Sequence, residues 1–414
     1  GDDGDYFCEN SECDFHEKLP IYTVDEVLYI KKPSMIIATV DKFAITPWKY
    51  KNVKKLFFNK KDKNQIKPQL IIQDELHLIS GKLGSMVGFF ELMIEKLCED
   101  VVDGKVVKPK IIASTATISN SQNQIRSLYG RESNLFPPQL NKMGNSFFAK
   151  TNEEKKGRMY IGIFFSASTS QQITLSRLTA YVAQEPKLYL FDKKDPEIAD
   201  MYWTSILYFN STRELNQANT LIETNIRAIL RKYYDRLGIS LKNESEKHKR
   251  RFLYSDKGKV ELTGRETESN LTKFFQRLQQ NKIIGINDKE IKTSGGSLVD
   301  ICLATNMIQV GIDISRLNIM IINGQPKTTS EYIQASSRVG RSKSDLGVVF
   351  TIYNTSKSRD RSHFERFNHY HSSVYSYVEP TSVTPFAKNL LERALHSVIL
   401  TLLKLVGNKE LEDR

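Results

Sequence analysis

The chain has 414 residues, with 60 lysines and arginines against 48 aspartates and glutamates, and its net charge of +12 is a modest bias toward a polyanionic partner. A hydrophobic content of 40% and only 12 prolines indicate two or three folded domains and exclude a disordered or collagen-like chain. The N-terminus has no apolar signal segment, no apolar stretch is long enough to span a bilayer, and the four cysteines make no disulfide framework, so we expect a cytoplasmic protein that meets no membrane.

Short apolar runs alternate along the chain with longer amphipathic stretches. Unbroken apolar character is typical of strands in a parallel sheet that is covered on both faces. The runs that predict strands are Met35–Val40, Leu70–Ile72, Lys110–Ala113, Met159–Phe165, Ser205–Phe209, Leu298–Ala304, Ile319–Ile322 and Val348–Tyr353. Helical spacing is present in Met86–Cys98, Arg213–Tyr234, Glu268–Asn281 and the tail from Phe386 onward. The alternation predicts α/β layers with ligands bound where strands end.

Two cysteines lie near the N-terminus, at Cys8 and Cys13, close to His16. Two thiolates are half of a tetrahedral zinc site, and the alternative is a pair of reduced cysteines near a chain end. Further along, residues 134–157 combine prolines, glycines and a charged run, which predicts a linker. A second polar stretch, Lys242–Arg251, predicts a solvated insertion.

The strongest local signal is an acidic motif, Gln73 to His77, that directly follows an apolar run. Adjacent carboxylates at the end of a buried strand suit metal–phosphate chemistry, in which Asp74 holds Mg²⁺ and Glu75 orients or deprotonates an attacking water. The alternative is an acidic pair on the surface. The next apolar run is followed by Ser114-Thr115-Ala116-Thr117, whose hydroxyls are placed to hydrogen-bond the acidic motif, although such clusters are also common in turns.

A third segment, Ala304 to Ile314, again begins in an apolar run. Gly311 permits a close backbone approach or a positive φ, and Asp313 supplies a carboxylate for a nucleotide hydroxyl. The alternative is a connection between strands with an incidental aspartate.

A fourth segment, Gln334 to Arg341, contains two arginines three residues apart, which lie on one face if the segment is helical. A planar guanidinium aimed at a phosphate stabilises the charge that develops during phosphoryl transfer. The alternative for Arg338 and Arg341 is a solvated basic helix end.

The segment Arg359–Tyr377 interleaves arginine, histidine, phenylalanine and tyrosine. Aromatic rings stack on bases while cations hold phosphates, so contact with a single strand is one interpretation. The other, which we favour, is a helix that packs its aromatic side onto the core. His369 and His371 are two residues apart and point in different directions on a helix, which argues against a metal site.

In order and spacing, the motifs DELH, STAT, ATNMIQVGID and QASSRVGR resemble motifs II, III, V and VI of superfamily 2 helicases. Ala38–Lys42 resembles motif Ib, and Leu207–Arg213 and Leu262–Arg265 lie where motifs IV and IVa are expected. Longer phrases, among them IIATVDKFA, QDELHLISGKLGSM, NSFFAK and SRDRSHFERFNHYHSSVYSYVEPTSVTPFA, resemble the DrmA family of DISARM-type anti-phage defence helicases. This likeness extends from about Cys8 to the C-terminus.

The resemblance implies roles for individual residues, with Arg341 as the arginine finger. The catalytic set would be Asp74, Glu75, His77, Gln334, Arg338 and Arg341. The coupling residues that relay the state of the acidic motif would be Ser114, Thr115, Ala116 and Thr117, while His77 and Gln334 would couple the nucleotide site to the second lobe. The nucleotide contacts of the second lobe would be Gly311 and Asp313. The nucleic-acid contacts would be Thr39, Lys42, Asn210, Ser211, Thr263, Arg265 and Thr305. The cofactors would be ATP, with Mg²⁺ at Asp74, and Zn²⁺ at Cys8 and Cys13 if a second ligand pair precedes residue 1.

One departure from the family pattern is the absence of a GxxxxGK[ST] motif, the P-loop that cradles nucleotide phosphates. The pair Gly81-Lys82 lacks both the preceding glycine and the following Ser or Thr. In this family the P-loop precedes every motif found here. We therefore expect the chain to be the C-terminal part of a longer protein, and by itself to bind ATP weakly and hydrolyse none.

We predict an α/β fold of two RecA-like parallel-sheet lobes, the first truncated, with a C-terminal helical extension. The expected parts are the end of a zinc-ribbon-like insertion (1–33), the remainder of lobe 1 (34–133), the linker (134–157), lobe 2 (158–355) and the extension (356–414). The expected function is an ATP-dependent helicase or translocase that acts on single-stranded or forked DNA in anti-phage defence, with an operon-encoded partner subunit, and RNA is the alternative substrate. Two other functions share these motifs: a non-catalytic nucleic-acid-binding scaffold and an ATP-driven remodeller of protein–nucleic acid complexes.

Overall fold

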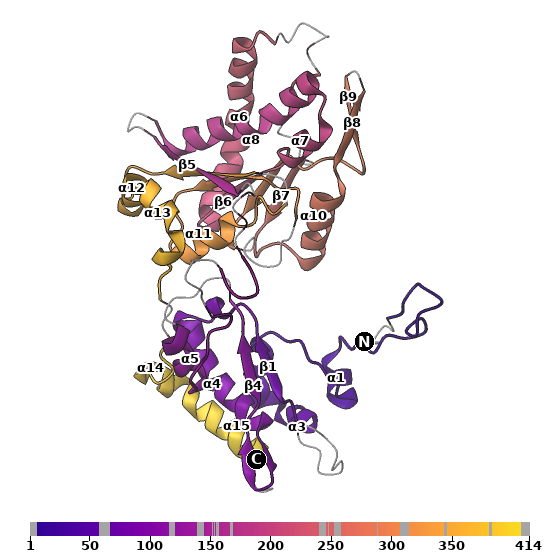
Figure 1. Cartoon of the computed structure of the whole chain (residues 1–414), viewed down its shortest axis with the longest axis vertical. Coiled ribbons are helices and arrows are strands. Elements are labelled where there is room, and N and C mark those ends of the chain that lie inside the picture. Colours follow the sequence, from indigo (N-terminus) through magenta and orange to yellow (C-terminus); the bar gives the residue numbers. More distant parts are fainter. Residues whose placement is uncertain are drawn as a thin grey trace. The chain divides into compact units, whose positions relative to one another are not determined.

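The computed structural model divides the chain into two compact units, Gly1–Phe136 with Pro380–Arg414, and Pro137–Glu379 (Figure 1). The structure describes residues 6–57, 67–115, 121–138, 145–150, 152, 154, 157–165, 169–239, 246, 248–251, 258–287, 289–306, 314–342, 346–380 and 383–406. The extension expected over 356–414 is divided between the two units at Pro380. No helix in these described ranges is both long and apolar enough to cross a membrane.

The first unit has a small parallel sheet of two strands surrounded by helices. Its elements are α1 (Asp25–Lys31), α2 (Asp41–Ala44), α3 (Thr46–Phe57), β1 (Leu70–Gln73), η1 (Leu76–Leu78), α4 (Gly81–Cys98), β2 (Asp100–Val102), β3 (Lys105–Val107), β4 (Lys110–Ala113), α5 (Ser121–Tyr129), α14 (Lys388–Leu390), the π-helical η5 (Leu391–Leu395) and α15 (His396–Val406). Strands β1 and β4 pair in parallel, with Leu70 opposite Lys110 and Gln73 opposite Ala113. The strands β2 and β3 form a separate antiparallel hairpin.

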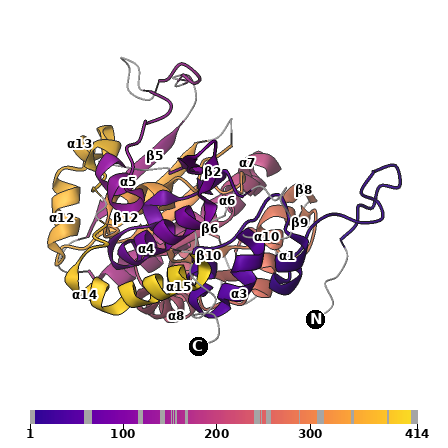
Figure 2. The same ribbon diagram turned by 90° about the horizontal axis from the view of Figure 1, so that it is seen from below.

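The core of this unit lies between helices that are distant in sequence. Helix α15 lies alongside α3 (Figure 2), and Val53, Met93 and Leu405 are buried together where α3, α4 and α15 meet. The predicted C-terminal packing helix is therefore present, because its apolar side has a partner in α3 and α4.

The strand predicted over Met35–Val40 is wrong, because residues 35–39 adopt no regular structure. Met35 and Ile37 are 71% and 86% exposed. An apolar run becomes a strand only when a neighbouring strand satisfies its backbone groups. No described strand pairs with this run, so the β-branched residues in it are not enough to make it a strand.

The second unit is built on a six-stranded sheet. Its elements are β5 (Arg158–Phe164), α6 (Gln171–Lys193), α7 (Pro196–Met201), β6 (Ser205–Phe209), α8 (Thr212–Arg236), β7 (Lys259–Leu262), α10 (Glu268–Gln280), β8 (Ile283–Asn287), β9 (Glu290–Thr293), β10 (Ile301–Ala304), β11 (Ile319–Asn323), α11 (Thr329–Ser336), β12 (Gly347–Tyr353), α12 (Ser358–Glu365), α13 (Phe367–Ser372) and η4 (Val374–Tyr377). The strand order is β5-β12-β11-β6-β10-β7, and every pair in this sheet is parallel. The strands β8 and β9 form a separate antiparallel hairpin.

Helices cover both faces of this sheet, as the apolar strands predict. Leu207 and Phe209 of β6 pack with α6 and α8, whereas Ile206 and Tyr208 pack with α10 and α11 on the opposite face. The parallel α/β prediction is confirmed for this unit. Helix α6 was not predicted, because its apolar residues lie all around the helix and Pro186 lies within it.

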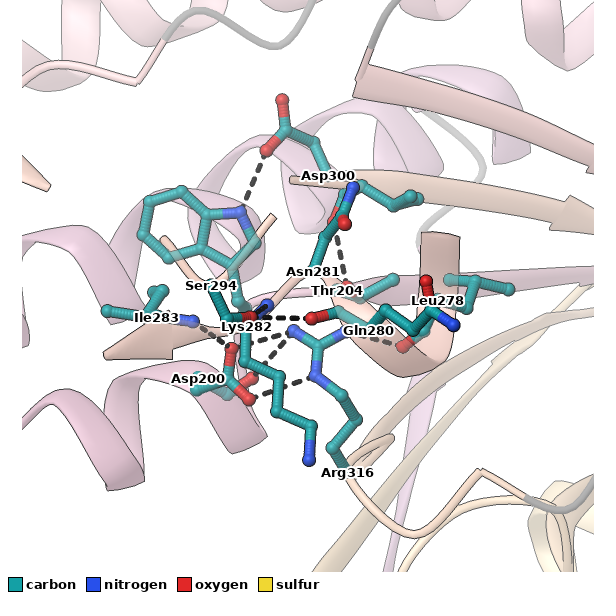
Figure 3. A network of polar contacts seen from close by, with 12 residues as sticks. Asp200, Thr204, Leu278, Gln280, Asn281, Lys282, Ile283, Ser294, Asp300 and Arg316 are labelled. Atoms are coloured by element: carbon teal, nitrogen blue, oxygen red, sulfur yellow. Dashed lines mark hydrogen bonds and ion pairs between the residues drawn. The ribbon is translucent and has the colours of Figure 1, made fainter. Parts of the chain in front are cut away.

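A buried polar network lies beside the amino ends of the sheet strands (Figure 3). Arg316 donates from Nε and Nη2 to the two carboxylate oxygens of Asp200, at 2.9 and 2.8 Å, and from Nη1 to the Leu278 carbonyl at 3.0 Å. The Ile283 amide donates to Asp200 Oδ1 at 2.8 Å. These bonds connect α7, the end of α10, β8 and the segment before β11. The side chains of the ion pair are almost fully buried, with Arg316 6% and Asp200 9% exposed.

Buried arginines correct the end of the solvated insertion expected over Lys242–Arg251, of which residues 242–245 and 247 lie outside the described residues. At the end of this stretch Arg250 and Arg251 are 2% and 3% exposed. Arg251 Nη2 lies 2.7 Å from Asp300 Oδ1, and its guanidinium lies 3.8 Å from the centroid of the Trp203 ring. Arg251 can be buried because the Asp300 carboxylate and the face of the Trp203 ring take the place of water around its guanidinium.

We predict that Asp200→Ala lowers the free energy of unfolding of the second unit by about 3–5 kcal/mol, because it leaves the buried Arg316 without its carboxylate. The measurement is urea unfolding in a Trp48→Phe background, followed by the emission of Trp203, whose backbone amide donates to the Asp200 carbonyl at 3.2 Å. The matched control is Glu197→Ala, which removes an exposed carboxylate from α7, the helix that also contains Asp200. The control should change little, and equal effects of the two substitutions would contradict the assignment.

Candidate functional site

The acidic motif and the hydroxyl cluster follow the two paired strands of the first unit. β1 ends at Gln73 and β4 at Ala113, so Asp74 and Ser114 lie at the same edge of the sheet. The backbone pairing continues past the strands: the Ser114 amide donates to the Gln73 carbonyl at 2.9 Å, and the Leu76 amide donates to the Ser114 carbonyl at 2.9 Å. The pairing register thus places the two motifs side by side.

Asp74 is held by two donors. The Ser114 hydroxyl and the Glu75 amide, the latter at 2.9 Å, both donate to Asp74 Oδ1. These bonds, that of Ser114 first, lower the pKa of Asp74 because they stabilise its charged form. Asp74 is exposed and stays ionised, as a carboxylate that meets a cation must.

Glu75 occupies a strained position between β1 and η1. Its φ and ψ of 51° and 46° lie in the left-handed region, which non-glycine residues rarely adopt and which is often found at functional sites. Its Oε2 lies 3.3 Å from His77 Nδ1, and this nitrogen lies 3.1 Å from Thr115 Oγ1. The His77 side chain, only 8% exposed, therefore connects the half-buried Glu75 to the hydroxyl cluster.

Asp74 and Glu75 fit Mg²⁺ better than a metal whose ligands all come from the protein. Nowhere in the described ranges do three or more His, Cys, Asp or Glu side chains group around a metal position. Mg²⁺ is typically held by one or two carboxylates, with phosphates and water as the remaining ligands, and Asp74 with Glu75 can supply that share. Cys8 and Cys13 are free and partly buried, and the described residues give them no further ligands, so nothing supports zinc.

The two arginines of the second unit lie in a turn and not on a helix face. α11 ends at Ser336, before Arg338 and Arg341. Gly340 has a φ of 65°, and a Cβ added to it would lie 2.6 Å from the Cα of Gly347. Only glycines allow this back-to-back approach, which directs the chain at the point where the arginines stand. Gln334 lies within α11 and is buried.

Sequence reasoning missed the residue that holds this turn. Arg158, the first residue of β5, donates from Nε to the Val339 carbonyl at 2.7 Å and from Nη2 to the Ser337 carbonyl at 3.1 Å. Arg341 Nε donates to the same Ser337 carbonyl at 3.1 Å. Arg158 precedes Val339 by 181 residues, so no local pattern could have revealed the contact.

The predicted nucleic-acid residues of the second unit follow three adjacent strands. Asn210, Thr305 and Thr263 come directly after β6, β10 and β7 and therefore lie along one sheet edge. Thr305 and Thr263 are buried, and the Thr263 hydroxyl donates to Glu261 at 2.9 Å.

The remaining predicted contacts differ in how much of the side chain is available. Ser211 is exposed, and its hydroxyl accepts the Glu214 amide at 3.2 Å as the N-cap of α8. Arg265 is exposed beside Asn216, and Thr39 of the first unit is exposed. Lys42 forms an ion pair with Asp25 at 2.9 Å. Four further predicted residues, Ala116, Thr117, Gly311 and Asp313, lie outside the described residues.

The aromatic segment Arg359–Tyr377 packs mainly onto its own unit, as the favoured interpretation predicts. The rings of Phe364 and Phe164 stack with centroids 4.6 Å apart, and Tyr370 is 3% exposed. His371 Nδ1 lies 2.8 Å from the Phe367 carbonyl, and its Nε2 lies 2.9 Å from the Tyr332 hydroxyl. Both nitrogens have hydrogen-bond partners, which argues against a metal at this histidine.

We predict that Ser114→Ala raises the pKa of Asp74 toward its ordinary value, because it removes the main donor to the carboxylate. Because the pKa of Asp74 is lowered in the folded state, its ionised form stabilises the fold at pH values above the ordinary aspartate pKa. This contribution is lost as the pH falls through the folded pKa. The measurement is an NMR titration with carboxyl-labelled aspartate, in which Asp74→Asn identifies the resonance. Thr115→Val is the control, and an unchanged titration in Ser114→Ala would refute the assignment.

Comparisons with known proteins find similarity over almost the whole chain. Residues 205–343 match the model of the helicase conserved C-terminal domain. The chain is 38% identical to the DISARM protein DrmA of Bacillus paralicheniformis, in an alignment that covers 96% of this chain and 36% of that protein. The chain therefore spans about a third of that relative's length.

Solved structures show the same fold. The helicase MrfA, bound to DNA and AMPPNP, matches with a TM-score of 0.58 and 16% identity, over 92% of this chain and 42% of MrfA. The Mycobacterium smegmatis helicase Lhr, bound to single-stranded DNA and AMP-PNP, matches with a TM-score of 0.51 and 12% identity, over 92% of this chain and 43% of Lhr. With the ordered motifs and the parallel sheets, these matches support one assignment: the chain belongs to the superfamily 2 helicases and is close to DrmA.

Proposed function

We propose that these residues form the greater part of the motor of an ATP-dependent helicase or translocase that acts on DNA in anti-phage defence of the DISARM type. The observation that carries the proposal is the hydrogen-bonded cluster of Asp74, Glu75, His77, Ser114 and Thr115 at the carboxyl edge of β1 and β4. A surface acidic pair would need neither the strained backbone of Glu75 nor donors from a second strand. The DNA and defence parts of the proposal rest on the similarity to DrmA and on the DNA-bound MrfA and Lhr.

In the proposed reaction Asp74, kept ionised by Ser114 and the Glu75 amide, would hold Mg²⁺, which supplies charge neutralisation at the ATP phosphates. Glu75 would orient the attacking water and accept its proton. His77 and Thr115 would connect the state of Glu75 to β4. The P-loop that such turnover requires is not among these 414 residues.

The second unit would contribute cations and phosphate contacts. Arg341 and Arg338 would stabilise the charge that develops on the transferred phosphoryl group. Gln334, Gly311 and Asp313 would act at the nucleotide as the family resemblance implies. Asn210, Ser211, Thr263, Arg265 and Thr305 would lie along the nucleic-acid backbone, and of these Ser211 and Arg265 have exposed side chains.

We predict that Glu75→Gln, in a protein that joins these residues to a P-loop region, lowers ATP turnover by roughly 10²- to 10⁴-fold, because the general base is lost while the shape of the side chain stays. Nucleotide binding should persist, so a fluorescent ATP analogue should bind as in the wild type. Turnover is measured by phosphate release. Glu132→Gln, on an exposed carboxylate elsewhere in the same unit, is the control, and unchanged turnover in Glu75→Gln would rule out the role.

We also predict that Arg341→Ala in the same protein lowers turnover by roughly 10³-fold or more, because the phosphoryl group loses a cation, and leaves DNA affinity within a few-fold of the wild type. Phosphate release and DNA anisotropy measure the two effects separately. Arg126→Ala, an exposed arginine outside the site, is the control. Lost DNA binding with normal turnover would contradict the assignment.

A further inference from the structure

Helix α3 exposes a tryptophan that none of the helicase motifs includes. Trp48 is 79% exposed, whereas Trp203, the second of the two tryptophans in the chain, is 4% exposed and donates from Nε1 to Asp300 at 2.9 Å. A large ring in water is costly, and exposed tryptophans are common at contact surfaces. A single exposed ring does not define a site, so the assignment depends on the residues around Trp48.

The two sides of α3 differ in character. Tyr50, Val53 and Phe57 face the core that α3 shares with α4 and α15. Lys51 and Lys55 are exposed, and their spacing of four residues places them on one side of the helix that follows the kink, three residues beyond Trp48. The helix is irregular at Lys49, where φ is −105° and ψ 25°, so Trp48 lies in the turn before a kink and Lys51 and Lys55 follow it.

The segment that begins with α3 contains much of the excess charge of the protein. Residues 46–67 contain eight lysines and one acidic residue, a net charge of +7 in a chain whose total is +12. Asp25 of the neighbouring α1 lies 2.9 Å from Lys42 and 3.8 Å from Lys49, so it neutralises the lysines before and within the kink. Among the residues that the structure describes, no carboxylate pairs with Lys51 or Lys55.

We propose that Trp48, Lys51 and Lys55 form a binding site for single-stranded nucleic acid, in which a base stacks on the Trp48 indole and the two ammonium groups bind phosphates of the same strand. The inference rests on the proposed function, and it adds a stacking residue that the motifs do not contain. Lys51 and Lys55 lie about 6 Å apart along the helix axis, which lets both reach one strand. The charge favours a polyanion over an apolar partner, and the ring favours a ligand with exposed bases over a closed duplex.

The test titrates an oligo-dT strand of about 20 nucleotides into the full 414-residue chain, long enough to cover the site. Tryptophan emission should be quenched in the wild type and unchanged in Trp48→Phe, in which only the buried Trp203 remains. With a fluorescein-labelled strand, anisotropy should show roughly 5- to 150-fold weaker binding for Trp48→Ala, the equivalent of one stacked base, and a smaller loss for Trp48→Phe. An abasic strand of the same length should bind the wild type and Trp48→Ala equally.

The lysines are tested by salt dependence. Lys51→Gln with Lys55→Gln should lower the slope of log affinity against log salt by about 0.7 for each phosphate that the protein no longer neutralises. Lys105→Gln with Lys110→Gln, at exposed positions of the same unit, should leave the slope unchanged. Thermal unfolding of each variant verifies that the fold is retained.

The outcomes separate this inference from the proposed function. If the wild type binds oligo-dT but its emission does not change, and the variants bind as the wild type does, the α3 site is refuted and the proposed function stands. If the wild type binds no oligonucleotide, the proposed function fails as well, and the face of α3 then fits an acidic protein better.

Discussion

In a parallel sheet every strand ends at the same edge, so residues that follow different strands lie next to each other however far apart they are in sequence. This constraint brings Asp74 beside Ser114 in the first unit and lines up Asn210, Thr305 and Thr263 in the second. The hydrogen bonds of the acidic cluster depend on it, because one residue of slip between β1 and β4 would move Ser114 away from Asp74.

The reactive groups themselves lie on turns that distant residues hold in place. Glu75 keeps a left-handed backbone between β1 and η1, and the turn with Arg338 and Arg341 is fixed by the contact of Gly340 with Gly347 and by the guanidinium of Arg158. A turn fixed from outside orients its side chains more reproducibly than a free loop does, which lowers the entropic cost of forming the site.

The position of the charged residues matters more to a partner than the net charge of the chain. Arg251 and Arg316 each count toward the net charge of +12, yet both are buried against carboxylates and present nothing to a partner. Residues 46–67, by contrast, concentrate lysines in one short segment, beginning with a helix whose other side is apolar core. A polyanion responds to the local field, which falls off within about a Debye length, and not to the sum.

The sequence by itself determined the parallel α/β class, most of the sheet strands and the acidic and arginine motifs, because apolar runs and motif spacing are local properties of the chain. It did not determine that Met35–Val40 stays outside a sheet, that Arg251 is buried, or that Arg158 supports the arginine turn. Each of these depends on a partner distant in sequence: a strand that must pair, Asp300 that must neutralise, and two carbonyls that must accept. Only the tertiary structure brings such partners together, because their contact energies do not exist until the chain has folded.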